Sequence, residues 1–173
     1  MFGKLFGGGE KYSLLKLSKG YTFDYQKVTW EIMEVYEYDW GRDGMSTEYK
    51  IEGDGQVAFL EVEDDDGDIV CLFSVEVEKH ELAPDFGPED FEGEEILSEL
   101  DYTDRRYALE DIYEGHYKNT TGMERSQKVT TYNFKDENHF VCIAQWADGS
   151  MDYSVGQEIE GDKIKKIKPP HIL

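Results

Sequence analysis

Apolar and polar residues alternate along much of this chain, which is the pattern of a half-buried β-strand. The clearest stretch spans residues 28–38, where β-branched and aromatic residues predominate. The residues on its regular face, at a period of two, are Val28, Trp30, Ile32, Tyr36 and Tyr38. Glu34 interrupts that face. The pattern predicts one long strand with a single apolar face.

Turns rich in Asp and Gly separate further segments of the same kind. Further strands are expected at residues 45–51, 57–63, 69–77, 106–113, 128–134, 139–146 and 151–155, although the Ala, Leu and Glu residues within 106–113 also suit a helix. Strands joined by short Asp-Gly turns at this spacing are typical of antiparallel meanders. The sequence therefore predicts an all-β, mainly antiparallel fold with little helix.

The two halves of the chain resemble each other. Residues 23–25 (Phe-Asp-Tyr) recur as residues 100–102 (Leu-Asp-Tyr), 77 positions later, and the Asp66-Gly67 turn recurs as Asp148-Gly149, 82 positions later. These offsets indicate an internal duplication, hence two similar β-meander or small-barrel units packed together. The expected parts are a flexible tail at 1–11, a β unit at 12–79, an acidic linker at 80–99, a second β unit at 100–168 and a tail at 169–173.

The net charge limits the kinds of partner that we expect this protein to bind. The 173 residues include 18 Lys and Arg against 39 Asp and Glu, a net charge of −21. Nucleic-acid binding requires a positively charged surface, so we do not expect this protein to bind DNA or RNA. Such a charge either keeps the surface soluble or favours a protein partner with a basic face.

Basic residues gather at the two ends of the chain. Residues 1–19 contain four lysines and one glutamate, and residues 163–173 contain four lysines and no acid. These ends either fold back onto the acidic body or contact an acidic partner or a membrane surface. Residues 1–6, with Phe2, Leu5 and Phe6 beside a lysine, are the candidate for weak peripheral membrane contact.

The apolar runs and the two cysteines indicate the cellular compartment and the state of the thiols. No run of about 18 apolar residues is present, and no secretory signal is visible. Cys71 and Cys142 each lie within an apolar run, as expected of buried free thiols. We expect a cytoplasmic protein.

Few residues in the sequence are candidates for a metal, catalytic or binding site. Asp64, Asp66 and Asp68 form an acidic turn and are weak metal-ligand candidates, because the EF-hand spacing fails when Gly67 is placed at its sixth position. No nucleophile elbow or phosphate-binding loop is present, so neither a metal nor another cofactor is expected. The aromatic residues Trp30, Tyr36 and Trp146 are candidate binding residues, with core packing as the alternative.

Several aromatic and glycine landmarks recur in the predicted strands and turns: Trp30, Glu48-Tyr49, the strand at 57–63, the Arg-Tyr-Ala-Leu segment at 106–109 and the Trp-Ala-Asp-Gly turn at 146–149. In these landmarks the chain resembles an uncharacterised bacterial family, the domain of unknown function 4178. The resemblance covers roughly residues 12–168 and implies no known activity or catalytic residue. Relatives tend to be encoded beside phage-shock-like envelope-stress proteins, which implies an accessory role near the inner membrane face.

Two hypotheses of function follow. The first is a non-enzymatic protein-interaction module that binds through its acidic face or an exposed strand edge. The second is a hydrolase or ligand-binding enzyme with an acidic site between the two halves. A deep pocket lined by convergent acids or histidines would distinguish the second from the first.

Overall fold

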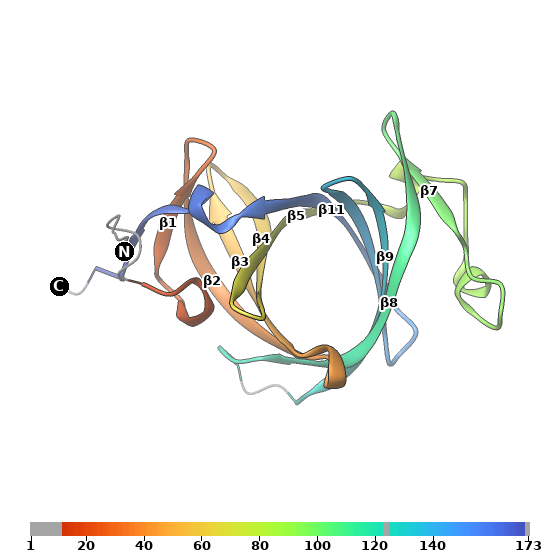
Figure 1. The fold of residues 1–173 in the computed structure, drawn as a ribbon, viewed down its shortest axis with the longest axis horizontal. Coiled ribbons are helices and arrows are strands. Elements are labelled where there is room, and N and C mark those ends of the chain that lie inside the picture. The colour runs from red at the N-terminus through yellow and green to blue at the C-terminus, as the bar shows by residue number, and fades with distance from the viewer. Residues whose placement is uncertain (1–11, 123–124, 172–173) are drawn as a thin grey trace.

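The computed structural model describes residues 12–122 and 125–171, which form almost entirely antiparallel β-structure (Figure 1). The first half contains β1 (Thr22–Tyr25), β2 (Val28–Asp39), β3 (Met45–Gly53), β4 (Gln56–Asp65), β5 (Asp68–Glu76) and β6 (Leu82–Ala83). The second half contains β7 (Glu99–Tyr102), β8 (Arg105–Asn119), β9 (Gln127–Asp136), β10 (His139–Trp146), β11 (Met151–Glu160) and β12 (Lys165–Lys168). The short 3-10 helices are η3 (Leu14–Lys16), η4 (Gly41–Asp43), η5 (Lys79–Glu81), η6 (Pro88–Phe91) and η7 (Gly161–Lys163). The predicted all-β antiparallel class is confirmed.

Eight of these strands close into a ring. Their order is β2-β3-β4-β5-β11-β10-β9-β8, and β8 pairs back onto β2 from Tyr36↔Asn119 to Asp39↔His116. The second junction between the halves is β5–β11, which runs from Ser154↔Glu76 to Glu160↔Val70. Each half therefore contributes four neighbouring strands to one ring, and the two pairings β2–β8 and β5–β11 are its seams (Figure 1). An eight-stranded ring has an interior wide enough for side chains or one small ligand.

A β-bulge divides each of the two long strands, β2 and β8. The extra residue is Met33 in β2 and Glu110 in β8, which are 77 positions apart. Before the bulge, β2 pairs with β1 and β8 pairs with β7; beyond it, the two strands approach each other. One inserted residue reverses which face the following side chains occupy.

The bulge at Met33 explains the interruption of the sequence pattern at Glu34. Trp30, before the bulge, packs in a core outside the ring, whereas Tyr36 and Tyr38, after it, border the ring interior. The prediction that these residues share one face is therefore wrong, because the bulge changes the parity of the strand.

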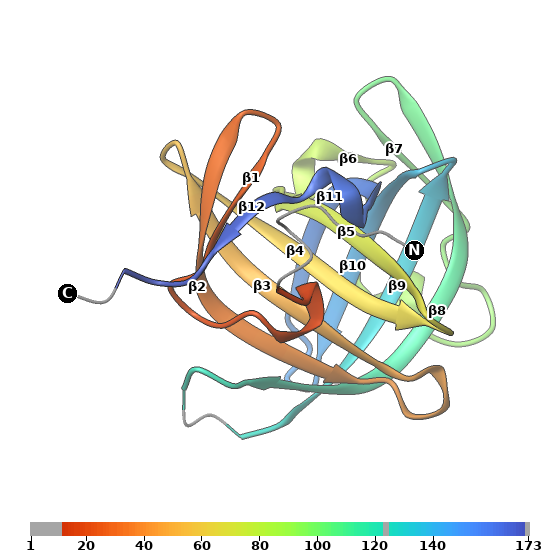
Figure 2. The same ribbon diagram turned by 60° about the vertical axis from the view of Figure 1, so that its left-hand side comes forward.

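Two hydrophobic cores lie on the outside of the ring. The first is formed where β1, β12 and η3 cover the outer face of β2–β5, as Figure 2 shows for β1 and β12. The second is formed where β6, β7 and η6 cover β8–β11. Fully buried members of the two cores include Phe23, Ile32, Tyr49, Ile51, Leu60, Leu100, Phe134, Val141 and Ile143. Since the apolar faces of the strands point outward into these cores, many of the side chains that face the interior are polar.

Tyr49 fixes η3 against the outside of the ring. Its hydroxyl donates a hydrogen bond to the Leu14 carbonyl oxygen at 2.6 Å and accepts one from the Leu17 amide at 3.1 Å. We expect Tyr49→Phe to lower the free energy of unfolding by about 1–3 kcal/mol, because both groups lose a buried partner. Urea unfolding measures this. Tyr21→Phe is the control, and equal midpoints for the two variants would contradict the prediction.

Candidate functional site

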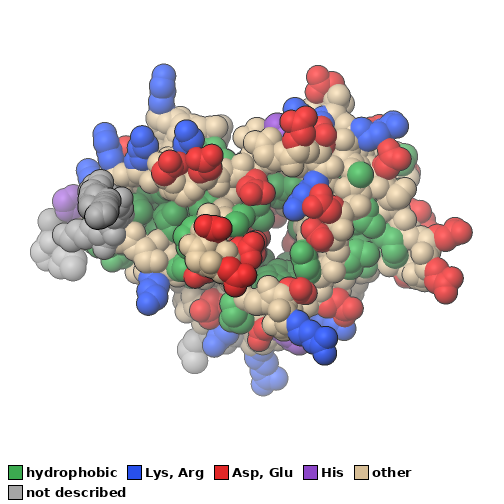
Figure 3. Space-filling model, in the orientation of Figure 1, with side chains coloured by type: hydrophobic (Ala, Val, Ile, Leu, Met, Phe, Trp, Pro, Cys, Tyr) green, Lys and Arg blue, Asp and Glu red, His purple; other side chains and the backbone are tan. Residues whose placement is uncertain are grey.

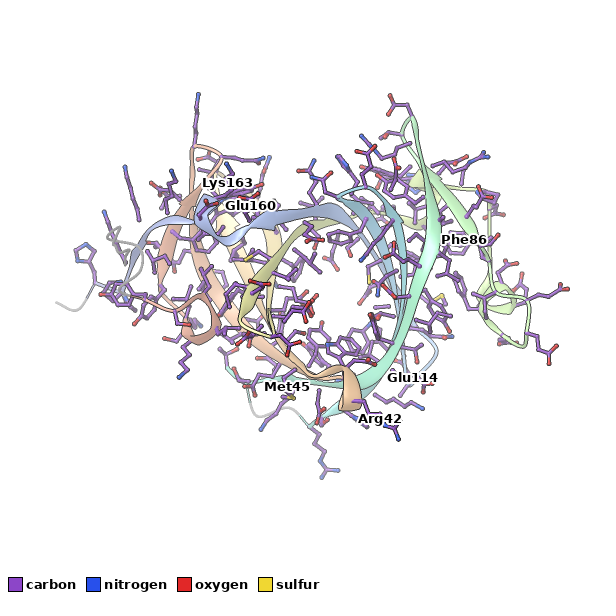
Figure 4. All side chains as sticks on the ribbon, in the orientation of Figure 1. Arg42, Met45, Phe86, Glu114, Glu160 and Lys163 are labelled. Atoms are coloured by element: carbon purple, nitrogen blue, oxygen red, sulfur yellow. The ribbon has the colours of Figure 1, made fainter. Side chains whose placement is uncertain are left out.

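The ring encloses a cavity of about 580 Å³ that is lined by residues from all eight of its strands. Ligand pockets commonly have volumes of about 300–1,000 Å³. Figure 3 shows the hollow from one end with acidic side chains around its mouth, and Figure 4 shows side chains projecting into the interior while Phe86 of the second core lies outside. We call this space the ring cavity; it lies between the two halves of the chain.

The ring cavity has a surplus of negative charge. Among the described residues that line it, eleven are Asp or Glu and two are Lys. Lys50 lies 3.5 Å from Glu34, and Lys135 lies 3.6 Å from Glu110 and 3.8 Å from Asp111. Both lysines are therefore already paired, and the remaining carboxylates keep the cavity negative.

Glu48 and Glu61 form the centre of the acidic lining. They are direct cross-strand partners on β3 and β4. The Tyr38 hydroxyl donates to Glu48 Oε1 at 3.0 Å, and the Ser46 hydroxyl donates to Glu61 Oε2 at 2.5 Å. Among the described residues, neither glutamate has a Lys or Arg within ion-pair distance. Like charges placed directly opposite each other in a sheet repel.

Their environment disfavours the charged form of both carboxyl groups. Burial inside the ring, and then the charge of Glu61, raise the pKa of Glu48. Burial also raises the pKa of Glu61, with a further contribution from Glu63, although the hydrogen bond from Ser46 opposes the shift. Both side chains keep part of their surface open because they border the ring cavity. The pair is thus held with little counter-charge beside an open space.

Aromatic rings cover the wall next to this pair. The aromatic wall consists of Tyr36, Tyr38, Trp40, Tyr113, Tyr117 and Trp146. Tyr38 stacks on Trp40 with ring centroids 5.1 Å apart and planes at 4°, and Tyr117 lies 5.1 Å from Trp146. The Trp40 indole N–H donates to Ser46 Oγ at 3.0 Å, so the wall is hydrogen-bonded to the acidic pair. Carboxylates beside aromatic rings are suited to binding cations.

The candidate binding residues predicted from the sequence are separated by the ring. Tyr36 and Trp146 both border the ring cavity, and each contacts Tyr117. Trp30 lies in the first outer core, where its indole donates to the Tyr25 carbonyl oxygen at 3.3 Å. The structure therefore brings two of these three residues together in the site and places the third outside it.

The acidic turn between β4 and β5 serves the backbone. Asp64 Oδ1 accepts a hydrogen bond from the Gly67 amide at 2.7 Å, and Asp66 adopts a left-handed conformation with φ of 52°. Asp64 also borders the ring cavity, whereas Asp66 and Asp68 do not. In the described part of the chain, no group of three or more His, Cys, Asp or Glu residues is arranged to hold a metal ion.

Cys142 also faces the ring cavity, but its surroundings make its thiol a poor nucleophile. Burial, followed by the charges of Glu61 and Glu48, raises the pKa of the Cys142 thiol. The thiolate is the nucleophilic form of cysteine, so this environment disfavours reactivity. Cys71 is buried in the first outer core, and both cysteines are free thiols.

Sequence reasoning missed Glu48 and Glu61 as site residues. In a strand with one apolar face, alternate glutamates usually face water. Only the closure of the ring, through two seams between distant segments, shows that this polar face surrounds a cavity.

The fold and the site define a closed antiparallel ring whose acidic and aromatic interior is large enough for a small ligand. A family model described as "Domain of unknown function (DUF4178)" matches residues 18–161, and the chain belongs to that family. It is similar to an uncharacterized protein of Aquifex aeolicus (strain VF5), with 28% identity over 157 residues that cover 90% of this chain and 85% of that protein. No solved structure matches. None of the helices in the described residues has the length and apolar character needed to cross a membrane.

Proposed function

We propose that this protein binds a small, positively charged organic molecule inside the ring cavity. The observation that carries the proposal is a cavity of ligand size, open at its mouth, in which an unneutralised carboxyl pair adjoins a wall of aromatic rings. A cation held there gains charge attraction from Glu48 and Glu61 and contact with the ring faces. Its apolar part is removed from water by the aromatic wall.

The two halves share structural features at constant offsets, which identify the interior positions that correspond to each other. The two bulges are 77 residues apart, and the pair Phe23↔Trp30 recurs as Leu100↔Tyr107 at the same offset. The Tyr132 hydroxyl donates to the Phe91 carbonyl oxygen at 3.3 Å, as the Tyr49 hydroxyl does to an η3 carbonyl in the first half. These parallels support an internal duplication.

The interior positions have diverged between the halves. The pairings of β3 and β9 place Thr131 at the position of Glu48, and those of β4 and β10 place Ala144 at the position of Glu61. The first half thus supplies carboxyl groups where the second supplies small or neutral side chains. This difference leaves room in the cavity opposite a charged wall, as a bound ligand requires.

Direct binding measurements test the proposal. We expect hexyltrimethylammonium or hexylammonium to bind at least about tenfold more tightly than hexanoate, because the cavity is negative. Ala144→Trp should fill part of the cavity and weaken binding at least about tenfold, measured by isothermal titration calorimetry. The control is Ala108→Trp, at an exposed position of β8. Hexanoate binding as tightly as both cations, or unchanged binding in Ala144→Trp with a native circular dichroism spectrum, would refute it.

A protein partner with a basic face remains a prediction, supported by the net charge of −21. The same is true of the accessory role in envelope stress, the cytoplasmic compartment and the hydrolase alternative, for which Glu48 and Glu61 would be the candidate acid and base. The predicted membrane contact through residues 1–6 lies outside the described residues.

A further inference from the structure

The acidic pair has unused hydrogen-bonding capacity directed at the ring cavity. Each ionised carboxylate offers about four acceptor sites. Tyr38 donates to Glu48, and Ser46 donates to Glu61, each through one hydroxyl. A ligand that brings several N–H donors can therefore satisfy both glutamates at once.

The charged and titratable groups around the pair do not neutralise it. The groups that face it are neutral or negative: Tyr36 and Tyr38 on β2, Glu63 on β4, Glu76 on β5 and Cys142 on β10. The two cations of the cavity lining are already paired, Lys50 on β3 with Glu34 and Lys135 on β9 with Glu110 and Asp111. The positive charge must therefore come from a proton in the free protein or from a ligand in the complex.

In the free protein, the surroundings of the pair favour a retained proton. Burial and mutual repulsion raise the pKa of Glu48, and burial raises that of Glu61. Two carboxyl groups this close share protons as a unit rather than titrating independently. A cation that binds beside both carboxyl groups stabilises their charged forms, so the pair can release the proton.

We propose that the ring cavity selects a primary alkylamine, whose ammonium group donates to both Glu48 and Glu61 and displaces the proton that the pair holds. This inference rests on the proposed function and names its ligand class. The ammonium stays protonated, the two glutamates become carboxylates and the displaced proton passes to the solvent. The alkyl chain lies along the aromatic wall.

The wall itself favours a primary amine over a quaternary one. Tyr38 and Trp40 lie parallel, with their planes at 4° and their centroids 5.1 Å apart, so each ring covers part of one face of the other. A quaternary ammonium relies on open aromatic faces and has no N–H group to donate. A primary ammonium has three donors for the acceptors that Glu48 and Glu61 leave open.

Calorimetric titration of the full chain separates the outcomes. We expect hexylamine at pH 6.5 to bind at least about tenfold more tightly than hexyltrimethylammonium, because charge-assisted hydrogen bonds are strong. Its observed heat should differ between phosphate and MES buffers by the amount that release of about one proton predicts. Its affinity should rise by up to about tenfold per pH unit while the free pair still holds that proton, and should level off once the free pair has lost it.

Matched variants complete the test. Glu48→Gln and Glu61→Gln should each weaken hexylamine binding at least about tenfold and remove the buffer dependence. Glu52→Gln, on the same strand but exposed and outside the cavity lining, should change neither. Folding of each variant is checked by near-ultraviolet circular dichroism.

The results distinguish the two proposals. Equal affinity for the primary and quaternary amines, or the same heat in both buffers, would overturn the amine inference while leaving the proposed function in place. If neither cation binds, the proposed function itself fails.

Discussion

Gly156→Ala is expected to lower the free energy of unfolding by about 3 kcal/mol, a large effect for the addition of one methyl group. Gly156 pairs with Ser74 in the β5–β11 seam. A Cβ atom at this position would overlap the carbonyl oxygen of Phe73 and lie 2.8 Å from the Ser74 Cα. These are backbone atoms, so the clash is relieved only by separating the two strands. Chemical denaturation monitored by tryptophan fluorescence measures the loss.

Gly161→Ala is the matched control for this substitution. The nearest atom to a Cβ at Gly161 is a Leu14 methyl carbon at 3.4 Å, which is ordinary contact distance. We expect its stability to lie within about 0.5 kcal/mol of the wild type. Equal stabilities for Gly156→Ala and Gly161→Ala would show that the seam tolerates wider strand spacing.

The other seam has a similar constraint. A Cβ atom at Gly115 on β8 would lie 2.5 Å from the Asp39 carbonyl oxygen and 2.6 Å from Trp40 Cε3. Both seams therefore contain a glycine at which the neighbouring strand leaves no room for a side chain. Among the described residues, the ring strands of one half pair with those of the other at these two seams, so the cavity depends on close backbone approach at both.

Local patterns predicted the eight strands of the ring, although β8 continues to Asn119 and β11 to Glu160, beyond the predicted ends at residues 113 and 155. Alternation over residues 57–63 and the Asp-Gly turns act between near neighbours in sequence, so they identify β4 and the hairpins without knowledge of the fold. The closure of the ring could not be predicted in this way. The pairs Tyr36↔Asn119 and Val75↔Val155 join residues about 80 positions apart, and no local pattern encodes them.

The orientation of side chains was harder to predict than their secondary structure. Trp30 and Tyr36 have the same parity in β2, but the bulge at Met33 places one outside the ring and the other at the cavity. Glu48 has the alternation expected of a water-facing residue, although it faces the cavity. In both cases the deciding contact comes from distant strands, which a period of two cannot reveal.

The arrangement of apolar surface explains how a polar interior is tolerated. In many barrels the apolar faces of the strands meet at the centre, whereas here they pack outward beneath β1, β12, β6 and β7. Stability is therefore supplied by the two outer cores, and the interior is free to carry groups that oppose folding. Functional sites commonly retain such destabilising groups.

The double variant Glu48→Gln/Glu61→Gln tests whether the carboxyl pair destabilises the fold. We expect it to be more stable than the wild type at pH 8, by about 2 kcal/mol. Burial raises the pKa of both carboxyl groups in the folded state above the unfolded value of about 4.3. Between those values the folded protein binds more protons than the unfolded chain, so wild-type stability falls as pH rises through that window. Each unit of pKa shift corresponds to about 1.4 kcal/mol, and contact with the cavity reduces the full effect.

At pH 5 the advantage should be smaller, because this pH lies only just above the unfolded value and the raised folded pKa values still favour protonated carboxyl groups. Urea denaturation of both proteins at pH 5 and pH 8 gives the comparison, with Glu52→Gln as a variant that removes an exposed acid from the same strand. A double variant that is less stable than the wild type at pH 8 would mean that the carboxylates are satisfied within the protein. The ring cavity would then have no unmet negative charge with which to attract a cation.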